Sequence, residues 1–519
     1  MSFRKYIRRN IYKWHRVTSL LVAVPVLLWT ISGFLHPVMG ALKPEVKNSR
    51  LPATTIDTSA ITISLKEALQ QNGIDSLQNF RIVKLYRGFY FQVWQKGLDS
   101  LTYLNCESGN VLTNGDQHYA AYLAQRYLWE ENGTGKNDNH DHGKLTASLS
   151  SGASVDVRSG PVKPNTKVVS TKRLTKFTDH YKASNKLLPV YEVAFNREDS
   201  IRLYIDTKAD RLSLASDEKK RWFTNFFSLT HSWSFLNGLG KTKAVLLGTF
   251  SLLCLLSSVF GFAVYNIMKP KKKSSTQSKR WHRVLGNIFL LTTLLYAFSG
   301  AWHAFAKLPA RALLSLEKQN ISSADVDLNL QELLTNLSPD EKLSNVSVAQ
   351  VNGELYWQVV YKKEKTVAKK YIATKTGAVL KNGDAAYAAS LAAAFKGAEQ
   401  ADIVATSAVS SFNHRYSMMN KRLPVVENKF EDGDAVFVET ATGEIAALTK
   451  PADEAERFSF SNLHMHHYWE MWLGKAAGKA AKNTVLIAST LGLLLLALTG
   501  IIIYLRKRFL NAKKASQIS

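Results

Sequence analysis

Two apolar stretches decide the architecture of this chain: WHRVTSLLVAVPVLLWTISGFLH at residues 14–36 and WHRVLGNIFLLTTLLYAFSGAWH at residues 281–303. The second repeats the first, because both start with Trp-His-Arg-Val and both contain Ser-Gly followed three residues later by His. His15 matches His282, so the offset between the copies, 282 minus 15, is 267 residues. A repeated pattern of this length indicates an internal duplication.

Four runs of the sequence are long and apolar enough to cross a bilayer as helices. None contains Asp, Glu, Lys or Arg, and each reaches the length of roughly 20 residues that a bilayer core requires. The first run is too long for a signal peptide, and the third repeats it in mid-chain, so we expect the first to be retained. The four runs are Val17–Gly40, Ala244–Met268, Val284–Ala306 and Thr484–Leu505.

Basic residues gather at one end of these helices, within residues 4–16, 269–273 and 506–508. Lys and Arg mark the cytoplasmic side of membrane helices, so we expect both termini in the cytoplasm. The two long segments then lie outside, in the periplasm of a bacterial inner-membrane protein. Much of the net charge of +26 lies in these cytoplasmic flanks, which removes the need for a nucleic-acid partner.

The outer segments also match each other. SGNVLTNGDQHYAAYLA from Ser108 corresponds to TGAVLKNGDAAYAASLA from Thr376. Alternating residues predict a hairpin over 80–95, and Asn352-Gly353 predicts the turn of its counterpart. Helical stretches precede the hairpins at about 64–71 and 328–334. The first half alone carries a polar insertion at 131–167, rich in Gly, Ser, Asn and Asp.

The expected fold is a membrane bundle of four transmembrane α-helices with periplasmic α+β domains, formed by a two-fold duplication. Both halves start inside, so the repeats are parallel and their axis runs along the membrane normal. The expected parts are a cytoplasmic N-terminus with the first helix (1–40), a periplasmic segment (41–240), the second helix (241–269), a cytoplasmic loop (270–282), the third helix (283–306), a second periplasmic segment (307–480), and the fourth helix with a cytoplasmic tail (481–519).

These features together resemble the PepSY-associated transmembrane family of iron-regulated membrane proteins. The resemblance covers nearly the whole chain, and its most specific elements are His-Arg at the start of the first and third helices and Ser-Gly near their outer ends. A third specific element is the pattern His-x-x-x-x-x-x-Gly before the second and fourth helices. Glu107-Ser-Gly109 and Lys375-Thr-Gly377, each after the last strand of its outer segment, belong to the same order of features. The resemblance implies PepSY-like outer domains and a haem-containing reductase of siderophore-bound ferric iron. Some relatives carry a flavin reductase domain, which is not expected here, so the electron donor would be a separate cytoplasmic reductase or a quinol.

Histidines matched between the halves are the candidate axial ligands of haem b, with one or two haems per chain. Neutral imidazole is a good axial ligand, and a helix bundle can hold a haem between facing histidines. An ionisable residue in a membrane helix is costly, so its presence in both copies suggests a function. The candidates are His36 with His303, His231 with His467, and His15 with His282.

Simpler roles compete with ligation at each position. His15 and His282 could be interfacial anchors beside Arg, and His231 and His467 could be surface groups of amphipathic helices. His464 and His466 have no match in the first half by this alignment and are weak candidates for a metal site. His140 and His142 lie in the insertion, where a solvated loop is the simpler interpretation.

The sequence therefore predicts an oxidoreductase that passes electrons outward through haem to a ferric siderophore in the periplasm and so helps to release iron. Its catalytic residues stay unassigned, and a homodimer is conceivable. The alternative is a non-redox PepSY membrane module that binds a peptide, a protease or a siderophore. Cys106 and Cys254 lie at different depths, so no disulfide is expected, and c-type haem attachment is excluded. Hydrolase and nucleotide-binding motifs are missing from the sequence.

Overall fold

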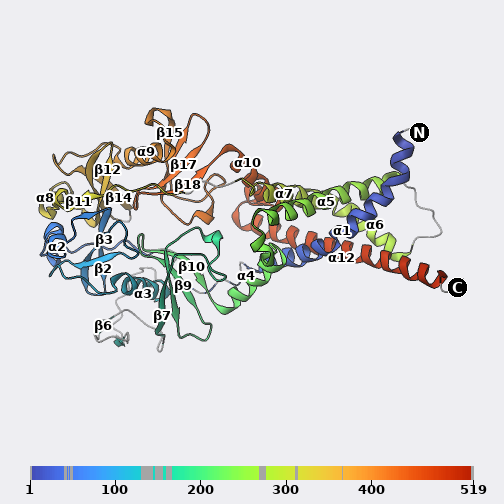
Figure 1. Ribbon diagram of the computed structural model, residues 1–519, viewed down its shortest axis with the longest axis horizontal. Helices are drawn as coiled ribbons and strands as arrows, with labels where there is room; N and C mark the ends of the chain where they lie inside the picture. The colour runs from blue at the N-terminus through green and yellow to red at the C-terminus, as the bar shows by residue number, and fades with distance from the viewer. Residues whose placement is uncertain are drawn as a thin grey trace. The chain divides into compact units, whose positions relative to one another are not determined.

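The computed structural model describes residues 3–39, 42, 44, 46, 51–129, 144–146, 156–158, 166–267, 276–309, 314–364 and 366–515. The chain divides into two compact units, which are described separately. The helical unit contains Met1–Lys43, Lys219–Ala312 and Pro451–Ser519, and the α+β unit contains Pro44–Glu218 and Leu313–Lys450. Figure 1 shows the long helices of the first unit and the sheets of the second.

Three helices of the helical unit are each long and apolar enough to cross a membrane: α1 (Phe3–Met39), α5 (Lys241–Ile267) and α12 (Lys475–Ala515). They run side by side in Figure 1, with α1 packed against both α5 and α12. The apolar side chains on their outer surfaces are exposed, as expected where lipid replaces water. The chain is therefore a multi-pass membrane protein.

The expected third span is not one straight helix. It consists of α6 (Gln277–Ile288) and α7 (Leu290–Phe305), which are bent by 63° at Phe289. The Phe289 ring occupies the space that a side chain at Gly492 of α12 would need. The pair counts as a fourth span only if both pieces cross the membrane together. The expected third span at 283–306 is thus divided into two helices, and the fourth span stays a prediction.

Short helices before α5 and α12 complete the helical unit. The sequence-based division placed them in the outer segments 41–240 and 307–480, whereas the structure packs them with the long helices. They are α4 (Glu218–Thr230), the 3₁₀-helix Ser234–Leu239, α10 (Pro451–Ser459), the π-helix Phe460–His464 and α11 (Tyr468–Leu473).

The α+β unit contains the same order of elements twice. Each copy has a short helix, an antiparallel three-stranded sheet, a longer helix and an antiparallel four-stranded sheet. The first copy comprises α2 (Leu65–Gln71), β2 (Asn79–Leu85), β3 (Gly88–Trp94), β4 (Thr102–Asn105), α3 (Gly115–Trp129), β7 (Val168–Leu174), β8 (Val190–Phe195), β9 (Arg202–Asp206) and β10 (Arg211–Ser216).

The second copy follows the same plan. Its short helix is capped by Asn329, and its hairpin turn has positive φ at both Asn352 and Gly353, so the predicted turn is confirmed. The predicted hairpin over 80–95 is confirmed as well. The elements are α8 (Leu330–Thr335), β12 (Glu341–Val351), β13 (Glu354–Lys363), β14 (Thr366–Ala373), α9 (Gly383–Lys396), β15 (Ile403–Val409), β16 (Val425–Phe430), β17 (Ala435–Glu439) and β18 (Glu444–Thr449).

Four further strands are short. β1 (Ser76–Leu77) pairs with β11 (Ile321–Ser322), which joins the two copies at one edge. β5 (Lys144–Thr146) pairs with β6 (Asp156–Arg158), and these strands and residues 166–167 are the described parts of the predicted insertion 131–167. His140 and His142 lie outside the described residues.

Reciprocal hydrogen bonds join the two three-stranded sheets. The Oδ1 atom of Asn79 accepts from the backbone N–H of Val348 at 3.1 Å, and Oδ1 of Asn345 accepts from the N–H of Ile82 at 3.1 Å. Each asparagine therefore binds a backbone amide within a strand of the other copy, as in a two-fold symmetric interface. Apolar residues of both sheets share one core beneath these contacts.

A buried ion cluster joins the two four-stranded sheets. Arg211 of the first copy and Arg422 of the second both bind the carboxylate of Glu439, and Arg422 Nη1 lies 2.6 Å from Glu439 Oε2. Burial alone would raise the pKa of Glu439, but the two guanidinium charges outweigh it and lower the pKa. The carboxylate is therefore charged at neutral pH and holds the two copies together.

Candidate functional site

Two histidines face each other near the basic ends of the long helices. His15 lies on α1 and His282 on α6, and their ring centres are 6.3 Å apart with the ring planes tilted by 49°. These two residues occupy matching positions in the duplicated sequence. We call them the inner pair.

Backbone carbonyls fix the tautomer of the inner pair. The Nδ1 atom of His15 lies 3.0 Å from the carbonyl oxygen of Ser257, and Nδ1 of His282 lies 3.1 Å from that of Leu496. A carbonyl oxygen only accepts hydrogen bonds, so each Nδ1 carries the proton and each Nε2 keeps a lone pair. Neither Nε2 has a hydrogen-bond partner among the described residues. Both rings are thus prepared to bind a metal through Nε2.

Glycines make room for the two rings. A Cβ atom at Gly261 of α5 would lie 2.9 Å from Cε1 of His15, and one at Gly500 of α12 would lie 3.2 Å from Cε1 of His282. Gly261 is four residues after Ser257, and Gly500 is four residues after Leu496. Each half therefore supplies a carbonyl and a glycine, one turn apart, to position its histidine.

A second pair of facing histidines lies beside the Ser-Gly ends of α1 and α7. His231 directly follows α4, and His464 ends the π-helix. Their ring centres are also 6.3 Å apart, with an angle of 84° between the ring planes. We call these residues the outer pair.

Serine hydroxyls fix the tautomer of the outer pair. Ser32 Oγ lies 2.9 Å from Nδ1 of His231, and Ser299 Oγ lies 3.1 Å from Nδ1 of His464. Each hydroxyl donates its own proton to a carbonyl one turn earlier in its helix, so it accepts a hydrogen bond from the imidazole. Nε2 of each ring again keeps a lone pair. The Ser-Gly motif therefore acts on these histidines from a neighbouring helix.

The outer pair is neutral at physiological pH. Burial lowers the pKa of His231 to about 4 and that of His464 to about 3, and the neighbouring histidines lower both further. Neutral imidazole is the form that ligates iron.

A phenylalanine ring separates each outer-pair histidine from a further histidine. Phe227 stacks on His231 with ring centres 4.7 Å apart and makes an edge contact with His36. In the second half, Phe460 lies 4.8 Å from His464 and 4.3 Å from His303, measured between ring centres. His303 also binds the carboxylate of Glu456 through Nδ1. The prediction that His36 and His303 are iron ligands is untested, and the inner and outer pairs are a different set of candidate ligands.

The structure pairs His231 with His464 instead of with His467, its match in the sequence. His467 lies beside Glu470, with Nδ1 3.4 Å from Oε2, and its side chain is 40% exposed. His466 is buried and contacts the hydroxyl of Tyr296 at 2.9 Å. The described part of the chain contains no cluster of three or more His, Cys, Asp or Glu that could hold a metal ion, so a site built on His464 and His466 alone gains no support.

Part of the chain matches a known protein family. Residues 114–362 match the family model of the PepSY-associated TM region. The family resemblance drawn from the sequence is therefore confirmed. A search of curated proteins found no match for the chain. The PepSY-associated TM region includes His231, His282 and Ser299, so it contributes to both histidine pairs.

The separation of the rings in both pairs is compatible with a metal held between two imidazoles. Imidazole nitrogen binds first-row metals at about 2 Å, and the ring centre lies about 1.1 Å further away for ring bonds near 1.33 Å. Two such ligands that bind one metal from opposite sides have ring centres about 6.2 Å apart. Both pairs have close to this separation. His15 with His282, and His231 with His464, are therefore the residues that would hold a haem.

Helix α1 relates the two pairs along the bundle. His15 belongs to the inner pair, and Ser32, which binds the outer pair, comes 17 residues later. At 1.5 Å per residue this is about 25 Å. His36 would give about 31 Å by the same calculation. The outer pair is thus closer to the inner pair than the sequence-based choice of His36 implied.

Proposed function

We propose that this protein is a haem-containing reductase of a bacterial inner membrane that passes electrons outward to chelated ferric iron. The observation that carries the proposal is the shared geometry of the inner and outer pairs. Each has facing imidazoles 6.3 Å apart with protonated Nδ1 and an available Nε2. Histidines that only stabilised the fold would not need the same Nδ1-protonated tautomer in both pairs.

His15 with His282, and His231 with His464, would each hold one haem b. A haem bound in this way supplies a one-electron Fe(III)/Fe(II) couple whose potential depends on its ligands and their hydrogen bonds. The carbonyls of Ser257 and Leu496 hold the inner imidazoles in the ligating tautomer, and the hydroxyls of the two serines hold the outer ones. The surrounding apolar side chains keep water away from both pairs.

The proposed topology places the inner pair at the cytoplasmic side. Basic residues surround that end of the helices, and the positive-inside rule assigns it to the cytoplasm. Both termini then lie in the cytoplasm, α6 with α7 forms the fourth span, and the α+β unit lies in the periplasm. The reciprocal contacts of Asn79 and Asn345 support a duplication with parallel repeats.

Chelated ferric iron is the proposed substrate. Hard oxygen ligands hold Fe(III) much more tightly than Fe(II), so transfer of one electron weakens the chelate and releases the metal. The protein needs only to bring the chelate close to the outer haem, because the iron itself undergoes the redox change. The resemblance to siderophore-iron reductases supports this substrate class.

The test uses purified protein reduced with dithionite and freed from excess reductant under anaerobic conditions. Addition of a ferric trihydroxamate should reoxidise the haem, and a ferrous-specific chelator should collect Fe(II) in equal amount. The gallium chelate is the matched control, because Ga(III) has the same size but accepts no electron under these conditions. Haem that stays reduced with the ferric chelate would contradict the proposal.

A further inference from the structure

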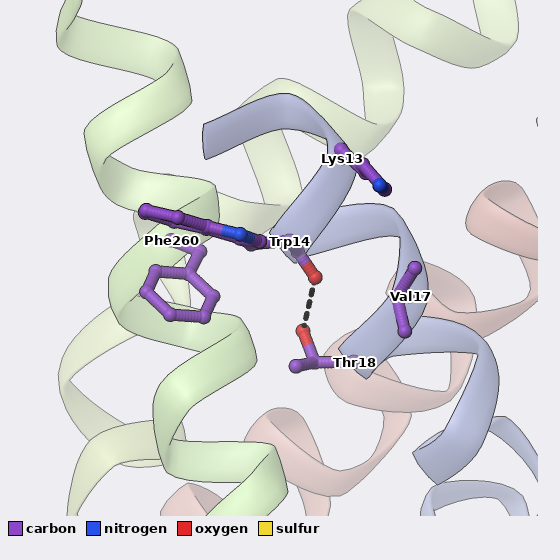
Figure 2. A pocket seen from close by; sticks show the side chains of 5 residues that line it. All are labelled: Lys13, Trp14, Val17, Thr18 and Phe260. Carbon is purple, nitrogen blue, oxygen red and sulfur yellow. Dashed lines mark hydrogen bonds between the residues drawn. The ribbon is translucent and has the colours of Figure 1, made fainter. Parts of the chain in front are cut away.

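Hydroxyl side chains of the long helices commonly bind carbonyl groups of their own helix. Figure 2 shows one case: Thr18 Oγ1 donates to the carbonyl oxygen of Trp14 at 2.9 Å, beside a hollow lined in part by Phe260. Thr30 Oγ1 donates in the same way to the carbonyl of Val26 at 2.8 Å. A polar group buried among apolar side chains has no water to bind, so leaving it unpaired is costly. A buried nitrogen that no described residue pairs therefore points to a ligand.

Two such nitrogens follow the outer-pair histidines in the chain. The Nε1 atom of Trp233 and the Nδ1 atom of His466 are buried, and neither has a hydrogen-bond partner among the described residues. Trp233 comes two residues after His231 and is 7% exposed. His466 comes two residues after His464 and is fully buried. The duplication thus supplies one unpaired nitrogen with each histidine of the outer pair.

The backbone at both positions has an unusual conformation. The φ angles of Trp233 and His466 are 48° and 55°, in the left-handed region that residues other than glycine seldom adopt. Such strain persists where the surrounding structure imposes it, and it is concentrated at active and ligand-binding sites. The same strain at two matched positions favours a shared binding role for the two side chains.

Aromatic rings hold the indole of Trp233 in the first half. Trp29 stacks on it with ring centres 5.6 Å apart and ring planes tilted by 13°. Phe250 makes an edge contact with the same indole, with ring centres 5.4 Å apart. The indole N–H is a donor only. Nε1 of Trp233 therefore requires a ligand atom that accepts a hydrogen bond.

Hydrogen bonds hold the imidazole of His466 in the second half. Ser489 Oγ donates to the carbonyl of Val485 at 2.6 Å, so it accepts a hydrogen bond from the hydroxyl of Tyr296, which lies 2.7 Å away. The Tyr296 oxygen then accepts from Nε2 of His466 at 2.9 Å. Nε2 carries the proton, and Nδ1 keeps a lone pair. Nδ1 of His466 therefore requires a ligand atom that donates a hydrogen bond.

The residues behind the two rings also occupy matched positions. Tyr296 matches Trp29 by the offset of the repeated apolar stretches, 296 minus 29, or 267 residues. Ser489 matches Phe250 by 489 minus 250, or 239 residues, which is also the offset between Ser257 and Leu496. All the contacts are between aromatic rings in the first half, whereas the second half uses hydrogen bonds. The two halves therefore build the same kind of support but present a donor on one side and an acceptor on the other.

We infer that Nε1 of Trp233 and Nδ1 of His466 bind the two carboxyl groups of the outer haem. The inference rests on the proposed function, since a haem held by His231 and His464 brings these groups. Haem b carries two carboxyl groups, and the two matched nitrogens provide one contact for each. The indole donates to an ionised carboxylate, and the imidazole accepts the O–H of a protonated carboxyl. One buried charge in place of two lowers the cost of burying the group.

The test compares haem b with its dimethyl ester, which has neither a carboxyl proton nor a carboxylate charge. All proteins carry His15→Ala, so that only the outer site takes up haem, and each apoprotein is titrated with both compounds. Haem should bind more tightly than the ester. In Trp233→Phe and in His466→Phe this preference should fall by about three- to tenfold, because one hydrogen bond to a carboxyl group is missing. Trp222→Phe is the control, since Trp222 is 65% exposed, and it should keep the full preference.

Infrared spectroscopy of haem with isotope-labelled carboxyl carbons gives a second readout. One carboxyl should absorb as a protonated acid and the other as a carboxylate. The acid band should shift in His466→Phe, and the carboxylate band should shift in Trp233→Phe. An equal preference for haem over its ester in all the proteins, or carboxyl bands that neither substitution shifts, would overturn the inference and leave the proposed function intact. Apoprotein that binds no haem would overturn both.

Discussion

The hydroxyl of Ser32 lies 2.9 Å from Nδ1 of His231 while it donates its own proton to the carbonyl of Leu28. This arrangement leaves the imidazole as the donor and makes Nε2 available. Ser299 repeats it with His464 at 3.1 Å. A serine near the outer end of each repeated helix thus prepares a histidine of the outer pair, which gives the Ser-Gly motif a physical role.

Replacing either serine should weaken the outer haem site. Ser32→Ala or Ser299→Ala removes the acceptor that holds the Nδ1 proton, and such outer partners typically contribute about 10–100-fold to metal affinity. The measurement is a haem titration of the apoprotein together with the midpoint potential. Thr30→Ala is the control, because the Thr30 hydroxyl bonds only carbonyls of its own helix. Equal affinity in Ser32→Ala and Thr30→Ala would contradict the assignment.

Substitution of one histidine should remove one haem and leave the other. His15→Ala or His282→Ala should lower the content from about two haems per chain to about one, and His231→Ala or His464→Ala should do the same at the outer site. The pyridine haemochrome assay measures this content. Loss of both haems in every variant would indicate general unfolding instead of two separate sites.

The histidines beyond the phenylalanines should behave differently. His36→Ala should keep both haems, because Phe227 lies between His36 and His231. The measurement is again haem per chain, compared with His231→Ala prepared in parallel. A haem content that falls in His36→Ala as far as in His231→Ala would reinstate His36 as the ligand that the sequence favoured.

A methyl group at Gly261 should disturb the inner pair. Its Cβ would lie 2.9 Å from Cε1 of His15, which is too close without a shift of the ring. Gly261→Ala should therefore reduce inner haem occupancy or change its low-spin spectrum, as measured by optical and EPR spectroscopy. Gly286→Ala is the control, since its Cβ would meet only Leu496 Cδ1 at the ordinary distance of 3.7 Å. Identical spectra for wild type and Gly261→Ala would show that the ring lies elsewhere.

The ion cluster of the α+β unit should dominate the stability of that unit. Glu439→Gln leaves Arg211 and Arg422 buried without their carboxylate, and breaking such a cluster costs about 3–5 kcal/mol. Exposed Glu332→Gln should change stability by less than about 0.5 kcal/mol. Thermal unfolding in detergent measures both. The lowered pKa of Glu439 means that the wild-type contribution is present at neutral pH and is lost as the pH falls through that pKa, so the two unfolding temperatures should converge in acid.

The sequence predicted the three long apolar helices and the paired hairpins, and it matched His15 with His282, because each depends on local patterns that occur twice in the chain. It did not predict the bend at Phe289, whose ring lies against Gly492 on a helix distant in the sequence. Alignment of the two halves also matched His231 with His467, because a Trp follows each of these histidines by two residues. A better signal was available, since Phe227 precedes His231 and Phe460 precedes His464 by four residues each.

The residues that follow His231 and His464 support the correspondence of these two histidines. Trp233 and His466 each follow an outer-pair histidine by two residues, and both have positive φ, 48° and 55°. The π-helix that ends at His464 and the extra helix α11 shift the later part of the second half. An alignment anchored on the conspicuous His-Tyr-Trp sequence therefore selected a residue three positions too late.

The most direct test of the central claim is the haem content and spectrum of the protein purified in detergent from haem-replete cells. The account predicts about two haems b per chain, both low-spin, with reduced-minus-oxidised bands typical of two axial histidines. Protein that contains no haem under these conditions would contradict the account and would favour the non-redox binding module.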